Sequence, residues 1–236
     1  MSQPARRPAP RPALQPGTAD RLLDAAERLF LERGFRGASL RALTGAAGVN
    51  LAAVAYHFGS KDELLRAVLE RRIAPVNRER LRRLERLEAD WRAGVPRRLE
   101  PVLEALLEPA FAAMRDDLES RDIATLLYSE PHESMPELIE SLFGECARRF
   151  HAALTGVLGR ANAATLALRF QMVIGAMIHF LAGRHRLSPE FTRIDPATND
   201  DAVLAELVAF LAAGLRAPAL AKPRRRRAAC AEESLR

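Results

Sequence analysis

Residues 40–65 read LRALTGAAGVNLAAVAYHFGSKDELL. Within this segment, apolar residues recur at helical spacing from Leu40 to Ala47 and again from Leu51 to Phe58. Between the two runs, Gly48 can take the positive φ of a tight turn, and Val49 can fill the angle between the helices. A connection this short forces the second helix across the first, so that the N-terminal face of the second helix points outward.

Polar residues stand where each helix of this segment should begin. Ser39 and Asn50 precede the two short helices, where their side-chain oxygens can accept hydrogen bonds from free backbone amides. Ser60 and Glu63 form a capping box for a third helix. Lys61 follows that cap, so its ammonium and the positive end of the helix can address the same phosphate.

A short helix that is held outward by a crossing partner fits the major groove of DNA. We therefore predict a helix-turn-helix motif at about residues 39–58. Tyr56 and His57 close the outward helix, where they can donate hydrogen bonds to neighbouring phosphates. Such contacts set the register of the protein on the duplex but read no base sequence.

The rest of the chain also predicts helices, so the expected fold class is all-α. No alternating apolar and polar pattern and no Asn-Gly or Asp-Gly hairpin signal occurs. Thr18 can cap a first helix that Gly34 ends, and Pro75 should kink or restart the helix that follows Ser60. Further helices are expected at residues 99–114, from about 121, from the Ser134–Glu137 capping box to 159, at 161–186 and at 200–216.

Basic residues concentrate at the two ends of the chain and in the helix after Pro75. The 236 residues carry a formal net charge of +6, and residues 1–17 and 218–236 supply more than this excess. We expect both ends to be disordered, either as solvated tails or as a source of non-specific attraction to phosphate. The arginines of the helix are expected on its solvent face, with contact to flanking DNA as the alternative: Arg78, Arg80, Arg82, Arg83 and Arg86.

The N-terminal third of the chain resembles the DNA-binding domain of the tetracycline-repressor (TetR) family of transcriptional regulators. The matching stretches are AAERLFLERGF at 25–35, ASLRALTGAAGVN at 38–50 and AYHFGSKDELL at 55–65. The resemblance implies a three-helix DNA-binding domain at residues 18–72 and a helical ligand-binding and dimerisation domain at 73–217, between the two ends, 1–17 and 218–236, whose composition predicts disorder. It also implies a symmetric homodimer, a repressor that a small-molecule effector releases from a palindromic double-stranded DNA operator.

The resemblance also places particular residues at the DNA. Ala55 stands where many members of the family have the first of two tyrosines, which removes one donor to phosphate. Because the outward helix is rich in apolar residues, thymine methyl contacts, Asn50, Arg41 and DNA shape are left to supply specificity. The residues that would face DNA are Ser39, Arg41, Asn50, Leu51, Ala52, Tyr56, His57 and Lys61.

The last two helices are expected to form the dimer interface on the same analogy. Small residues there allow close approach, and Val203, Leu207, Phe210 and Leu211 supply apolar area, although an ordinary buried core would show the same pattern. Several large side chains could line an effector cavity or simply pack in the core, and aromatic and Met side chains would suit an apolar or aromatic effector. They are Phe111, Met114, His151, Met172, Met177 and Phe180.

Other functions find little support in the sequence. It holds no glycine-rich phosphate loop, no nucleophile elbow and no metal-ligand spacing, so we expect no catalytic residue, no metal and no cofactor. The two cysteines, Cys146 and Cys230, are interpreted as a core side chain and a tail thiol.

No apolar run suits a membrane span or a secretory signal, so a cytoplasmic protein is expected. A ligand-independent activator or architectural DNA-binding protein is the main alternative, and an enzyme is a remote one.

Overall fold

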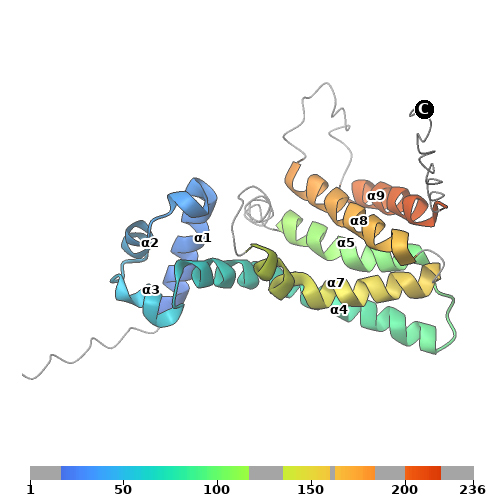
Figure 1. Cartoon of the computed structure of the whole chain (residues 1–236), viewed down its shortest axis with the longest axis horizontal. Helices are drawn as coiled ribbons and strands as arrows, with labels where there is room; N and C mark the ends of the chain where they lie inside the picture. The colour runs from blue at the N-terminus through green and yellow to red at the C-terminus, as the bar shows by residue number, and fades with distance from the viewer. Residues whose placement is uncertain (1–16, 117–134, 160–162, 184–199, 219–236) are drawn as a thin grey trace, which may run out of the picture.

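A computed structural model of the chain describes residues 17–116, 135–159, 163–183 and 200–218 (Figure 1). Within these ranges the chain forms eight helices and no strand, which confirms the all-α prediction. The helices are α1 (Thr18–Gly37), α2 (Leu40–Ala47), α3 (Ala52–His57), α4 (Lys61–Arg92), α5 (Leu99–Asp116), α7 (Met135–Leu158), α8 (Ala163–Gly183) and α9 (Asp200–Arg216).

The first three helices and the start of α4 form a small unit, residues 17–73, which we call the head. Its core is continuous and apolar, with Leu22, Phe30, Leu43 and Leu64 fully buried. One further member, Leu138, comes from α7, far along the chain, and is 5% exposed. The head is therefore closed by a helix that belongs to the rest of the molecule.

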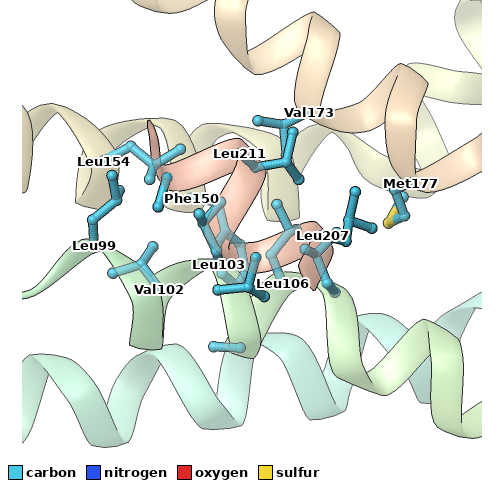
Figure 2. Close-up of a cluster of buried hydrophobic side chains, with 14 of the residues drawn as sticks. Leu99, Val102, Leu103, Leu106, Phe150, Leu154, Val173, Met177, Leu207 and Leu211 are labelled. Atoms are coloured by element: carbon cyan, nitrogen blue, oxygen red, sulfur yellow. The ribbon is translucent and has the colours of Figure 1, made fainter. Parts of the chain in front are cut away.

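The remaining described residues, 74–218, form a helical bundle that we call the body. Its core gathers side chains from α4, α5, α7, α8 and α9, and Figure 2 shows how they meet around Leu103, Phe150 and Leu207. Leu103, Leu107, Phe150 and Leu154 are fully buried. The core belongs to the body as a whole, since none of these helices buries its apolar face alone.

Helix α4 joins the head to the body without a break. Of the two outcomes expected at Pro75, a kink or a restart, the restart is wrong, because the helix runs through Pro75 to Arg92. Proline fits the φ of a helix, but it removes one backbone hydrogen bond and its ring crowds the carbonyl one turn back. Buried contacts in the turns on either side, at Ile73 and Asn77, help to keep those turns helical. The 32-residue rod is roughly 48 Å long.

Most of the expected helix boundaries agree with the structure. Gly34, with φ 71° and ψ 169°, interrupts α1 where the first helix was expected to end, and α9 spans the range expected for it. The expected Thr18 cap is wrong, because Gly17 precedes α1 in the left-handed conformation and Thr18 is already helical. The predicted helix near residue 121, the Ser134 cap and the two basic ends lie outside the described residues.

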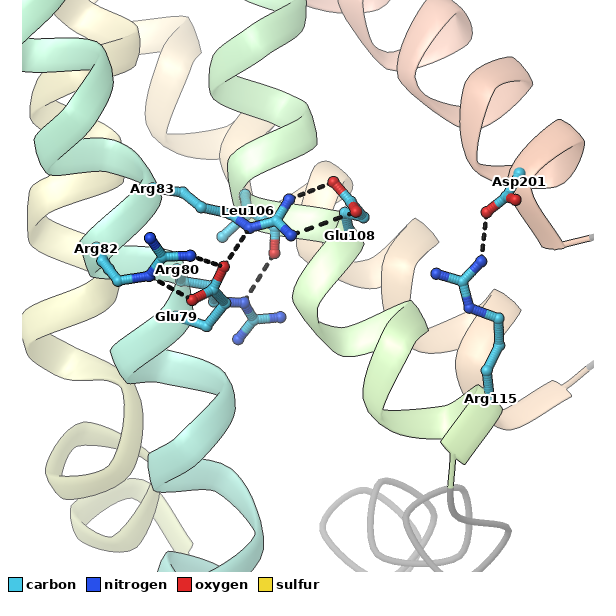
Figure 3. Close-up of polar contacts among 8 residues, drawn as sticks. All are labelled: Glu79, Arg80, Arg82, Arg83, Leu106, Glu108, Arg115 and Asp201. Atoms are coloured by element: carbon cyan, nitrogen blue, oxygen red, sulfur yellow. Dashed lines mark hydrogen bonds and ion pairs between the residues drawn. The ribbon is translucent and has the colours of Figure 1, made fainter.

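Arginine and acidic side chains connect α5 to its neighbours in the body (Figure 3). Arg83 of α4 pairs with Glu79 on its own helix and with Glu108 of α5. At the other side of α5, Arg115 pairs with Asp201 of α9, and Glu100 accepts from Arg216 of α9 at 2.7 Å. These partly exposed pairs orient the helices more than they stabilise them.

We expect the body to lose stability in acid through two of these carboxylates. Hydrogen bonds from Arg82 and Arg83 lower the pKa of Glu79 from 4.5 to about 2, and Arg216 does the same for the pKa of Glu100. A folded-state pKa below the unfolded value stabilises the fold above pH 4.5, and this contribution is lost as the pH falls toward 2. Because the groups are partly exposed, each contributes no more than about 1 kcal/mol.

Denaturant unfolding of wild type and of the Glu79→Gln, Glu100→Gln double variant across that pH range checks this. The variant should show a flatter dependence of unfolding free energy on pH. An unchanged slope would contradict the assignment.

Candidate nucleic-acid interface and internal cavity

The outward face of α3 is a small, well-defined surface. Ala53 and Val54 are buried in the head, whereas Asn50 and Ala52 are exposed on the other side. Leu51 is 52% exposed and Tyr56 is 75% exposed, which is unusual for side chains of this size. Apolar side chains that the monomer leaves in solvent commonly mark a contact surface.

The capping predictions for the two helices of the motif are confirmed. The Ser39 hydroxyl accepts a hydrogen bond from the Ala42 amide at 3.2 Å. The Asn50 side-chain oxygen accepts from the Ala53 amide at 3.0 Å. Gly48 takes the left-handed conformation, with φ 63°, at the turn between them. Since the Asn50 oxygen is occupied by the cap, its amide NH₂ is the group that can donate to a base edge.

Two substitutions of Asn50 should separate capping from base recognition. Asn50→Ser keeps a capping oxygen but removes the NH₂ donor, while Asn50→Ala removes both. We expect Asn50→Ala to lower the unfolding free energy by about 1 kcal/mol and Asn50→Ser to change it little. Both should alter base preference in a selection from random DNA. Equal unfolding free energies for the two variants would show that the cap contributes nothing.

Lys61, which was expected to face a DNA phosphate, makes a contact within the protein. The Ser60 hydroxyl caps α4 by accepting from the Glu63 amide at 3.1 Å, as expected. The Lys61 ammonium, however, donates to the Phe35 carbonyl and lies 4.3 Å from the centre of the Phe35 ring. Lys61 thus fastens the end of α1 to the start of α4, and a contact with phosphate would have to share or replace this bond.

His57 also differs from the expectation of an outward donor. Its Nε2 atom is buried and has no hydrogen-bond partner among the described residues. The ring lies edge-on to Tyr56, with 5.1 Å between the ring centroids. In the last turn of α3 the Tyr56 side chain is therefore exposed to solvent, whereas the Nε2 edge of His57 is turned inward. Ser39 and Arg41 remain exposed on the adjoining edge of the motif.

A partly open cavity of about 470 Å³ lies between α4, α5, α7 and α8, at the junction of the body with the head, and most of its lining is apolar. Of the six residues predicted to line an effector cavity, Met114 and Met177 do so. Phe111 is buried in the body core, and Phe180 packs at the margin of that core. His151 lies edge-on to Phe170, with 6.1 Å between the ring centroids, and is not part of the lining.

The placement of Met172 corrects its expected role. It is 59% exposed on the outer side of α8, together with Leu168, and Phe210 of α9 is 70% exposed. The apolar residues expected at the dimer interface divide in the same way, because Val203, Leu207 and Leu211 pack into the core of their own protomer. Only the helix packing decides which face of α8 and α9 looks outward.

Most of the cavity wall was not predicted, and its polar members include Arg72, Arg80 and Cys146. Arg80 was expected in solvent but is 4% exposed. The signal was present in the sequence, because position 80 continues the helical spacing of the buried Ile73, Asn77 and Leu84. Burial raises the pKa of the Cys146 thiol, although the nearby Arg80 charge acts in the opposite direction.

Helix α7 and the start of α4 connect this cavity to the head. Leu138 belongs to the head core, Ile139 lines the cavity, and Phe143 packs against both. In α4, Arg72 lines the cavity and its Nε donates to Glu27 of α1. The Glu27 side chain is 4% exposed and also accepts from Arg71. A buried carboxylate of the head is thus held by a residue of the cavity wall.

These features define a class of protein, a helix-turn-helix DNA-binding regulator with a helical body that carries an internal cavity. Comparison with known families gives the same result. Residues 22–68 match a model described as bacterial regulatory proteins, tetR family, and residues 104–214 match a tetracyclin repressor-like C-terminal domain. The chain belongs to the TetR family of transcriptional regulators, so it is not an enzyme.

Individual relatives agree with this assignment. The transcriptional regulator BetI of Brucella suis is 29% identical over 183 residues, which is 77% of this chain and 86% of BetI. SrpR of Pseudomonas putida is 36% identical over 93 residues, 39% of this chain and 38% of SrpR.

Solved structures show the same fold at lower identity. The fatty acid degradation regulator FadR from Bacillus halodurans has a TM-score of 0.57 at 16% identity, covering 84% of this chain and 99% of FadR. SmeT, the repressor of the Stenotrophomonas maltophilia efflux pump SmeDEF, has a TM-score of 0.55 at 23% identity, covering 83% of this chain and 88% of SmeT. Among the described helices, none is long and apolar enough to cross a membrane.

Proposed function

We propose that the protein is a homodimeric repressor that a small-molecule ligand releases from a palindromic operator. In this proposal residues 18–72 bind DNA, and residues 73–217 carry the ligand cavity and the dimer interface. The observation that carries the proposal is the cavity, because its wall shares Phe143 and Arg72 with the packing of the head. The same observation favours a ligand-responsive regulator over a ligand-independent one.

The outer face of α8 and α9 supports a second copy of the chain as the dimer partner. Leu168, Met172 and Phe210 are large apolar side chains left in solvent on adjacent helices. Gly175 and Gly214 lie on the same helices with open space where a side chain would begin. Such a face, with small residues beside large ones, suits close packing of helices around a two-fold axis. A two-fold axis would also place two heads on successive turns of a palindromic site.

Release would follow from the residues that the cavity and the head share. A ligand that displaces Ile139 or Phe143 would shift the first turns of α7, on which the head core rests through Leu138. A ligand near Arg72 would alter its bond to Glu27. The effect on operator affinity is limited to the difference in ligand affinity between the DNA-bound and released conformations.

A selection from random DNA, followed by gel shifts, tests this proposal. We expect a palindromic site with half-sites about one helical turn apart. Some metabolite should raise the melting temperature and lower operator affinity together. Recovery of non-palindromic sites bound by single protomers would contradict the homodimer, and a metabolite that binds without changing operator affinity would contradict release.

Tyr56→Phe is expected to weaken binding to all DNA sequences alike. The substitution removes a hydroxyl that can donate to phosphate, worth about 1 kcal/mol in each head, so the dimer should lose roughly tenfold or more in affinity. Phosphate contacts carry no sequence information, so the ratio of operator to scrambled DNA should be unchanged. Titrations of both DNAs on wild type and variant measure this. A selective loss on the operator alone would mean that Tyr56 reads bases.

A further inference from the structure

We propose that α3 recognises its operator through the C5-methyl groups of pyrimidines, and that Leu51 makes the central contact. Thymine displays this methyl group in the major groove, and 5-methylcytosine carries it at the same ring position. The inference deepens the proposed function by naming what the motif reads in DNA, and it rests on that proposal for the use of α3. Two observations carry it: the apolar outward face of α3, and the engagement of nearby polar groups within the protein.

The outward face of α3 is apolar along its middle. Leu51, Ala52 and Ala55 are exposed, while Ala53 and Val54 between them are buried in the head. Leu51 has helical backbone angles, φ −60° and ψ −31°, so it continues the turn of the helix. Residues four apart share a helix face, which places Leu51 and Ala55 together. Leucine and alanine side chains form no hydrogen bonds, so these three positions contact a base edge through apolar groups.

Leu51 is the large side chain of this face. It is 52% exposed in the free head, whereas its neighbours Ala52 and Ala55 are small and let the helix approach the bases closely. An exposed leucine gains from the hydrophobic effect when a partner covers it with apolar surface. A helix-turn-helix motif brings the major groove to this face, and the C5-methyl is the apolar group that the major groove displays.

Polar groups around this face are engaged within the protein. The Ser39 hydroxyl and the Asn50 side-chain oxygen each accept a hydrogen bond from a backbone amide at the start of their helices. The Nε2 atom of His57 is buried, and the Lys61 ammonium donates to the Phe35 carbonyl. The Asn50 NH₂ group can still donate to a base. Hydrogen bonding therefore supplies part of the base recognition, and the apolar face supplies the rest.

A side chain that reads a methyl group does not depend on the polar group beside it. Thymine carries an acceptor, O4, next to its methyl, and 5-methylcytosine carries a donor, the N4 amino group. Leu51 can form a hydrogen bond with neither, so it responds to the methyl group in both bases. We therefore expect operator affinity to increase when a cytosine at the position that Leu51 contacts is methylated at C5.

Gel-shift titrations of the full-length protein on an operator selected from random DNA test the inference. Each thymine of the half-sites is replaced by uracil, which keeps every hydrogen-bonding group and lacks the methyl. At the sensitive position, binding is also compared between a C·G pair and a 5-methylcytosine·G pair. We expect uracil to weaken binding roughly fourfold in one half-site and tenfold or more in both, the factor that burial of one or two methyl groups supplies. 5-Methylcytosine should exceed cytosine by a similar factor.

Variants then locate the reader of the methyl group. Leu51→Ala should bind the thymine and uracil operators alike, and Leu51→Met, which keeps a large apolar side chain, should retain most of the difference. Val95→Ala is the matched control, because Val95 is 51% exposed in the segment between α4 and α5, outside the head. It should show the wild-type ratio, as should uracil placed outside the half-sites. Because two DNAs are compared on each protein, a general loss of stability does not imitate the result.

Equal affinity of wild type for the thymine and uracil operators, or selected half-sites without thymine, would overturn the inference and leave the proposed repressor intact. Equal binding of cytosine and 5-methylcytosine at a uracil-sensitive position would also contradict methyl recognition. These comparisons need no variant, so they hold even if Leu51→Ala fails to fold. A methyl effect that persists in folded Leu51→Ala would overturn the role of Leu51. Failure to select any operator would instead contradict the proposed function, and the inference with it.

Discussion

Phe210→Glu is expected to separate the dimer into protomers and to lower operator affinity by roughly two orders of magnitude or more. Phe210 of α9 is 70% exposed, as are Leu168 and Met172 of the neighbouring helix α8, each at 59%. If this face is the dimer interface, a carboxylate there would be buried without a partner in the complex. A two-fold axis places the substitution in the interface twice. A cost of about 2 kcal/mol for each carboxylate therefore lowers the free energy of dimerisation by twice that amount.

The effect on DNA follows from the loss of the second head. A dimer binds its second half-site at the high effective concentration that the first provides, and a protomer loses this advantage. Sedimentation velocity gives the oligomeric state, and gel shifts give operator affinity. Val95→Glu is the matched control, because Val95 is 51% exposed in the segment between α4 and α5 and should leave both unchanged. A dimeric Phe210→Glu variant would place the interface elsewhere.

Leu138→Ala is expected to destabilise the head from a position outside it. Leu138 belongs to α7, yet its side chain is 5% exposed and completes the core that holds Leu22 and Leu64. Truncating a buried leucine costs about 2–5 kcal/mol, because the surroundings do not fully close the space. The head is small and its own core is limited, so we expect it to unfold before the body rather than together with it.

Scanning calorimetry measures this directly, as a second transition at lower temperature in Leu138→Ala. Leu154→Ala is the matched control: Leu154 is fully buried in the body core, so its loss should lower the stability of the body and leave the head docked. Leu138→Ala should also bind operator less tightly, because an unfolded head cannot hold α3 in the orientation that DNA binding requires. A single, unshifted transition would mean that α7 does not support the head.

The sequence specified the DNA-binding motif almost completely. The turn at Gly48, the Ser39 and Asn50 caps and the inward Val54 were all predicted from residues within one or two helical turns of each other. Such features depend on local backbone geometry, where a capping oxygen or a glycine at positive φ has few alternatives. What was missed within the motif were the contacts of side chains with other elements, such as Lys61 with the Phe35 carbonyl.

The cavity was much less accessible to sequence reasoning. Met114 and Met177 were predicted as large apolar side chains, but the same reasoning placed the exposed Met172 in the cavity, and the charge of Arg80 led to its placement in solvent. An arginine next to other arginines usually lies on the solvent-exposed face of a helix. The prediction for Arg80 therefore followed its charge rather than the helical spacing, which indicated burial. The packing of α4 against α5 brings the Leu106 carbonyl to Arg80, and Asn77 on α4, which is held by the Leu142 carbonyl of α7, supplies an amide oxygen; these acceptors help to make the burial of Arg80 tolerable.

Helix periods, caps and turns are local properties, so the chain alone determined that this protein is all-α and that a short helix, Ala52–His57 in the structure, follows the Asn50 cap. Which face of each helix turns inward is decided by contacts between residues far apart in the chain. Leu138 in the head, Arg80 at the cavity and Phe210 in solvent are examples of this. The free energy of burying a side chain depends on the partners that surround it, and those partners exist only once the helices have packed.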